Sequence, residues 1–94
     1  MKKMDLLVHK MTKTGSVSLI YQNEFIEWLK SLKFSYLTIE YLVKNVRILA
    51  RKRLLNLSKP EFENEMWSRY KRAMRATYSN AYRHYWKFRS ELSV

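Results

Sequence analysis

The chain has 94 residues, of which 47% are hydrophobic, one is glycine and one is proline. That length suits one small domain, and so few turn-forming residues argue against an all-β fold. Nineteen Lys and Arg residues against eight acids give a formal charge of +11, so we expect a polyanionic partner, first nucleic acid and second an anionic membrane surface. The absence of cysteine excludes disulfides and thiolate metal sites. No apolar run approaches the roughly 20 residues of a membrane span.

Residues 1–17 mix charged residues with short apolar pieces and contain the only glycine. Leu6, Leu7 and Val8 could form a short strand or a docked arm, but the mixture is more typical of a flexible, basic tail. Charged residues interrupt any signal-peptide core, so we predict an intracellular protein, cytoplasmic or nucleoid-associated. A membrane-surface role needs a single strongly amphipathic basic helix, whereas the apolar faces of this chain are better used against each other, so we predict no membrane partner. We therefore divide the chain into an N-terminal tail, 1–17, and a helical domain, 18–94.

A wide apolar face predicts a first helix from about Ser18 to Ser31. Tyr21, Phe25 and Trp28 recur at steps of four and three residues. Ser18 or Ser16 is the expected N-cap.

A second helix is predicted from about Tyr36 to Leu55, with Ser35 as its cap. Its apolar face consists of Ile39, Leu42, Val43, Val46, Leu49 and Ala50. Another face steps by four, three and four residues through Glu40, Lys44, Arg47 and Arg51. Such a stripe is either a solvated face or a contact surface, and its scarcity of acids favours contact.

The third helix has the clearest start signal, because Ser58 and Glu61 form a capping box and Pro60 occupies the first turn. Its predicted buried face consists of Phe62, Met66, Tyr70 and Ala73 or Met74. The basic residues that step by three on the other side are Arg69, Arg72 and Arg75.

Residues 76–79 are the predicted break, and Thr77 or Ser79 should cap a fourth helix that reaches about Leu92. The residues expected to face inward are Ala81, Tyr85, Phe88 and Leu92. Arg83 and Lys87 lie one turn apart on another face. A further stripe of Tyr78, Tyr82 and Trp86 is either core or, if exposed, a partner surface.

Nothing in the sequence favours catalysis. The two histidines, His9 and His84, belong to segments expected to lie far apart, so we predict no metal site. No Gly-rich loop could cradle a phosphate, and no serine has the turn and base that a nucleophile needs. We therefore predict no cofactor and no enzymatic activity for the chain on its own.

The order of motifs resembles the core-binding domain of tyrosine recombinases of the phage-integrase type. After the Thr38-Ile39 helix start, Leu42, Val46 and Leu49 fill the apolar positions four, eight and eleven residues beyond the threonine. The motifs that carry the resemblance are Phe25-x-x-Trp28-Leu29, Ser35-x-x-Thr38-Ile39, Leu57-Ser58 and Thr77-x-x-Asn80-Ala81. The resemblance implies a SAM-like bundle of four helices that clamps one side of a DNA site, while a separate domain cleaves the strand. It also implies DNA contacts by Lys44, Arg47, Arg83 and Lys87.

The sequence thus predicts an all-α bundle of four helices that binds double-stranded DNA, mainly through phosphates. The candidate DNA-binding residues are Lys44, Arg47, Arg51, Arg69, Arg72, Arg75, Arg83 and Lys87. Arg69, Arg72 and Arg75 are candidates from the charge pattern alone. The alternative is a protein-interaction or transcription-regulator module, or a homo-oligomer, that uses the aromatic stripe of Tyr78, Tyr82 and Trp86. RNA binding also stays open, because basic and aromatic faces stack on single strands.

Overall fold

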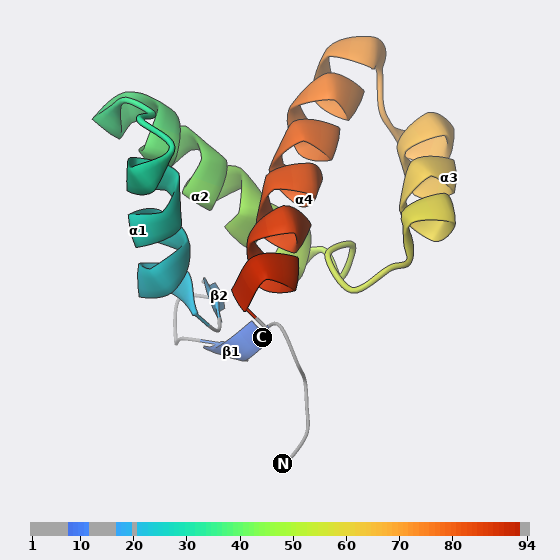
Figure 1. Ribbon diagram of the computed structural model, residues 1–94. Coiled ribbons are helices and arrows are strands. Elements are labelled where there is room, and N and C mark those ends of the chain that lie inside the picture. The colour runs from blue at the N-terminus through green and yellow to red at the C-terminus, as the bar shows by residue number, and fades with distance from the viewer. Residues whose placement is uncertain (1–7, 12–16, 20, 93–94) are drawn as a thin grey trace.

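Four helices and one antiparallel pair of strands make up the part of the chain that the structure describes, residues 8–11, 17–19 and 21–92 (Figure 1). The structure is a computed structural model. Its elements are β1 (Val8–Met11), β2 (Val17–Leu19), α1 (Gln22–Ser31), α2 (Tyr36–Arg51), α3 (Lys59–Arg69) and α4 (Arg72–Leu92). The predicted all-α bundle of four helices is confirmed.

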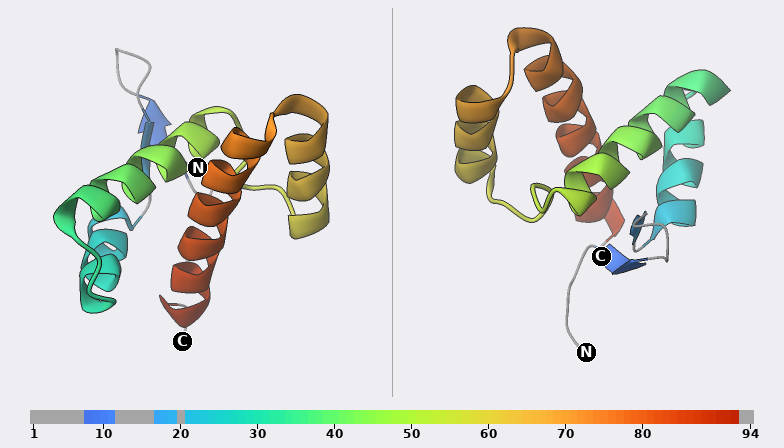
Figure 2. Two further views of the ribbon diagram at one scale, coloured as in Figure 1. Left: turned by 90° about the horizontal axis from the view of Figure 1, so that it is seen from above. Right: turned by 180° about the vertical axis from the view of Figure 1, so that it is seen from behind.

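The helices are arranged around a central pair, α2 and α4. Figures 1 and 2 show α1 beside α2 and α3 beside the first half of α4. None of the helices described is long and apolar enough to cross a membrane.

The strands correct the predicted tail. Val8 pairs with Leu19, and Met11 pairs with Val17. The sequence predicted a tail and a helix start in this region, but the chain is extended here. Leu19 is 5% exposed and belongs to the hydrophobic core, and its burial favours this extended segment. Ser18 therefore lies in β2 and does not cap α1, while Ser16, Leu6 and Leu7 lie outside the described residues.

Two helix starts follow the local sequence as predicted. The Ser35 hydroxyl accepts a hydrogen bond from the Thr38 backbone amide at 3.2 Å. The Ser58 hydroxyl accepts from the Glu61 amide at 3.4 Å, and the Glu61 carboxylate accepts from the Ser58 amide at 3.2 Å. The predicted capping box is therefore confirmed.

The end of α2 differs from the prediction. The helix stops at Arg51 rather than Leu55, because Arg53 takes a left-handed conformation with φ 62°. The Leu54 amide then donates to the Leu49 carbonyl at 2.9 Å, the long-range bond of a Schellman motif. This turn directs Leu54 and Leu55 into the core.

The break between α3 and α4 falls at residues 70 and 71, not at 76–79 as predicted. Tyr70 is extended, with φ −125° and ψ 148°, and its carbonyl accepts a hydrogen bond of 2.8 Å from the Arg75 guanidinium. Its ring meets Tyr78 edge to face at 5.2 Å. Thr77 and Ser79 therefore lie inside α4 and cap nothing, and Arg72 and Arg75 belong to α4 rather than α3.

The aromatic stripe of α4 belongs to the core. Tyr78 and Tyr82 are buried, and Trp86 is half-buried. The Tyr82 hydroxyl donates to the Leu57 carbonyl at 2.6 Å, and the Trp86 indole donates to the Leu55 carbonyl at 3.0 Å. The stripe thus anchors the connection between α2 and α3, and the prediction of a partner surface on it is wrong for Tyr78 and Tyr82.

The inward positions of α4 are mostly as predicted. Ala81, Tyr85 and Phe88 are buried, and the ring of Tyr85 meets Phe25 of α1 at 5.2 Å. Leu92 is instead exposed, since it occupies the last turn of the helix.

Candidate nucleic-acid interface

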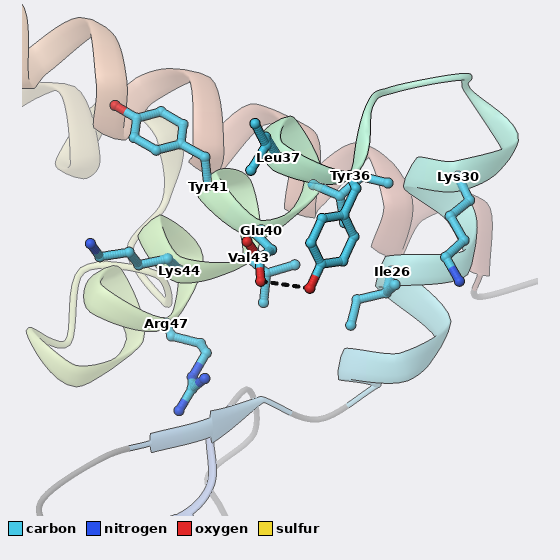
Figure 3. Close-up of a pocket in the computed structure, with 10 residues that line it drawn as sticks. Ile26, Lys30, Tyr36, Leu37, Glu40, Tyr41, Val43, Lys44 and Arg47 are labelled. Atoms are coloured by element: carbon cyan, nitrogen blue, oxygen red, sulfur yellow. Dashed lines mark hydrogen bonds between the residues drawn. The ribbon is translucent and has the colours of Figure 1, made fainter.

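The outward face of α2 carries three of the predicted cations, spaced by three and four residues. Lys44 and Arg51 are exposed, and Arg47 is half-buried. Figure 3 shows the side chains of Lys44 and Arg47 extending from this helix. Lys52 and Arg53 follow at its end and are exposed as well. We call these five residues the α2 basic face.

Two cations of this face lack an acidic partner. Within residues 8–11, 17–19 and 21–92, neither Lys44 nor Arg51 forms an ion pair. Glu40, the only acid of α2, lies one turn before Lys44 but accepts a hydrogen bond from the Tyr36 hydroxyl at 2.9 Å (Figure 3). That hydrogen bond, together with the charge of the carboxylate, raises the pKa of Tyr36 above its usual value. No ion pair among the described residues compensates the positive charge of Lys44 or Arg51.

Two side-chain hydroxyls, one from α2 and one from α4, meet where these helices cross. The Tyr41 hydroxyl lies 3.4 Å from the Thr77 hydroxyl, and this contact joins the two helices. Burial raises the pKa of Tyr78, and the nearby charge of Arg51 opposes that rise, so Arg51 lies close to the same crossing. Guanidinium, ammonium and hydroxyl groups are the side chains that most often contact phosphates.

An apolar groove of about 710 Å³ between α1 and α2 borders the basic face (Figure 3). Ile26 and Val43 line it, and Lys30 and Lys44 lie along it. Leu37 is 74% exposed on the same helix. The candidate interface thus combines charge with exposed apolar surface.

Three of the other predicted cations have local partners. Arg69 pairs with Glu65 at 2.8 Å, and Lys87 pairs with Glu91 at 3.5 Å. Arg83 donates to the Asn80 side chain at 3.1 Å. Exposed pairs of this kind are worth little, but they reduce the net charge that each cation offers to a phosphate.

The eight predicted residues do not form one surface. Lys44, Arg47 and Arg51 lie on α2, whereas Arg72 and Lys87 lie near opposite ends of α4, roughly 22 Å apart along its axis. The α2 group brings three of these cations together near hydroxyls and exposed apolar side chains.

Three residues of interest were not predicted from the sequence: Tyr41, Arg89 and Trp67. The Arg89 guanidinium lies 5.1 Å from the ring centroid of Tyr21 and donates to the Tyr85 hydroxyl at 3.3 Å, so this cation has a structural role. Tyr41 and Trp67 lie off the apolar stripes of their helices. This position was the only feature of the sequence that could have indicated that they are exposed.

The described residues offer no metal site. They contain no group of three His, Asp or Glu side chains that could hold an ion. His84 is structural, because its Nδ1 lies 2.8 Å from the Asn80 carbonyl and its ring meets Phe34 at 5.6 Å.

Comparison with known proteins finds no match for this chain among family models, curated proteins or solved structures.

Proposed function

We propose that the chain is a DNA-binding domain that contacts duplex DNA mainly through its phosphates, with the α2 basic face as the principal surface. The observation that carries the proposal is the uncompensated charge of Lys44 and Arg51 beside the hydroxyls of Tyr41 and Thr77. A polyanion would relieve the self-repulsion of a chain with a net charge of +11.

The geometry of α2 suits such a role. Lys44 and Arg51 lie two helical turns apart, about 10 Å along the axis, so they would reach different phosphates. An α-helix also fits the major groove, which is roughly 12 Å wide. Each phosphate neutralised releases counterions, and this release supplies much of the affinity.

The resemblance to the core-binding domain of tyrosine recombinases agrees with this proposal. A domain of that type holds one side of a DNA site and is not catalytic on its own. We extend the proposal to this role, with strand cleavage assigned to a separate domain.

A titration of the full chain with labelled duplex and single-stranded DNA at two salt concentrations tests the proposal. The informative variant is Lys44→Ala with Arg51→Ala. The matched control is Arg69→Ala with Lys87→Ala, which removes the same charge from cations that already have acidic partners.

We expect the native chain to prefer duplex and to lose affinity steeply with salt. The Lys44/Arg51 variant should reduce the slope of log K against log salt by about 1.8, because each phosphate contact contributes about 0.9. The control should reduce it less. Equal effects of both variants would show that net charge alone drives binding, and no binding at low salt would refute a nucleic-acid partner.

A further inference from the structure

Trp67 on α3 is unusual among the tryptophans of this chain. Trp28 and Trp86 are half-buried, and their indole nitrogens donate to Glu91 at 2.8 Å and to the Leu55 carbonyl at 3.0 Å. Trp67 is 71% exposed, and its indole forms no hydrogen bond with the described residues. A large aromatic side chain is thus left open to solvent on the face of α3 that adjoins α4.

A guanidinium group covers one face of this indole. The Arg75 guanidinium carbon lies 3.9 Å from the centroid of the Trp67 ring system. The same guanidinium donates to the Tyr70 carbonyl at 2.8 Å, so its position is fixed by the turn between α3 and α4. Because Trp67 stays mostly exposed despite this stack, its other face is available to a planar ligand.

The indole borders a depression of about 350 Å³ between α3 and the start of α4. That volume lies within the range of small-ligand sites, which starts at roughly 300 Å³. The side chains that line it include Glu63, Met66, Trp67, Arg72, Arg75 and Ser79. Arg72 is exposed and forms no ion pair within the described ranges.

We propose that an unpaired nucleobase stacks on the open face of Trp67 while Arg72 binds its phosphate. Every base has a π-face, and aromatic stacking is the common way in which proteins hold unpaired bases. Arg75 on the opposite face holds the indole in place through a cation–π contact. The Glu63 carboxylate could accept a hydrogen bond from an exocyclic amino group of the base.

This site deepens the proposed function, since it adds a contact of a different kind with the same class of partner. It lies between α3 and α4, whereas the proposed duplex contacts lie on α2. An experiment can therefore refute one of the two proposed sites without refuting the other.

The test compares two single-stranded DNA oligonucleotides of equal length and charge, one of deoxyadenylate and one fully abasic. The readouts are affinity and quenching of tryptophan fluorescence. We expect the native chain to bind the deoxyadenylate strand at least about fivefold more tightly than the abasic strand. Trp67→Ala should abolish this ratio, and Trp67→Phe should retain part of it.

Two controls separate stacking from charge. Tyr36→Ala removes another exposed aromatic side chain and should leave the ratio unchanged. Lys44→Ala with Arg51→Ala should weaken both strands alike and also preserve the ratio, even if the proposed duplex interface is correct.

A native chain without preference for the base-containing strand would overturn the proposal, and so would a ratio that survives Trp67→Ala. Adenosine monophosphate is the second probe. Quenching by the mononucleotide would support a site for a free nucleotide, and quenching by the strand alone would support a site within a strand. Quenching by neither would refute the site.

Discussion

Replacing Tyr82 by Phe tests whether the aromatic stripe of α4 anchors the connection between α2 and α3. The Tyr82 ring lies parallel to Phe62 at 4.0 Å, and this stack survives the substitution. The change removes only the hydroxyl that donates to the Leu57 carbonyl at 2.6 Å. Loss of one such hydrogen bond should lower the free energy of unfolding by about 1 kcal/mol. For a domain of this size, the melting temperature should fall by about 4–8 °C.

Thermal unfolding followed by circular dichroism measures the effect, with urea unfolding as a second measure. Tyr36→Phe is the matched control, because it removes an exposed hydroxyl that bonds only to Glu40 on the same helix. This control should barely change the melting temperature. If Tyr82→Phe were as harmless as Tyr36→Phe, the hydroxyl of Tyr82 would not hold the connection in place.

Three further predictions concern the caps and the buried phenols. Ser58→Ala should lower the free energy of unfolding by about 1 kcal/mol, whereas Ser68→Ala in the last turn of α3, where the serine is exposed, should change it by less than about 0.5 kcal/mol in urea unfolding. Lys33→Gly should raise it by about 0.5–1 kcal/mol in the same assay, because Lys33 has φ 70°. Stability should fall as pH rises above about 10, since burial raises the pKa of Tyr82 and Tyr85 and the unfolded chain releases their protons first. Urea midpoints at about pH 9 and 11 check this, and Tyr82→Phe should reduce the fall.

The starts of α2 and α3 and the ends of α1 and α4 could be predicted from the sequence, whereas the starts of α1 and α4 and the ends of α2 and α3 could not. Ser35 and Ser58 cap α2 and α3 through their own side chains, which is chemistry within one turn of the chain. The end of α2 depends instead on a left-handed conformation at Arg53, a position where glycine is usual. The break at Tyr70 likewise involves neither glycine nor proline, so the sequence carries no local signal for it. Contacts with Tyr78 and Arg75 hold the extended backbone there.

The position of this break also bears on the aromatic stripe, for which the sequence left both core and partner surface open. Because α3 ends at Arg69 and α4 begins at Arg72, α3 lies alongside α4 (Figure 1), and Phe62 stacks on Tyr82 at 4.0 Å. The burial of Tyr78 and Tyr82 decides between the two alternatives in favour of core. The sequence pattern could not decide this, because it depends on where α3 packs.

The charge pattern located the cations on the helices, but spacing alone does not show which of them form ion pairs. Glu40 and Lys44 have the four-residue spacing of a helical ion pair. In the structure the Glu40 carboxylate accepts a hydrogen bond from the Tyr36 hydroxyl at 2.9 Å, and Lys44 forms no ion pair with the described residues. At Arg69 the same spacing does form an ion pair, with Glu65 at 2.8 Å. Two turns with the same spacing of an acid and a cation therefore differ in pairing, and this difference depends on side-chain conformations that the sequence pattern does not fix.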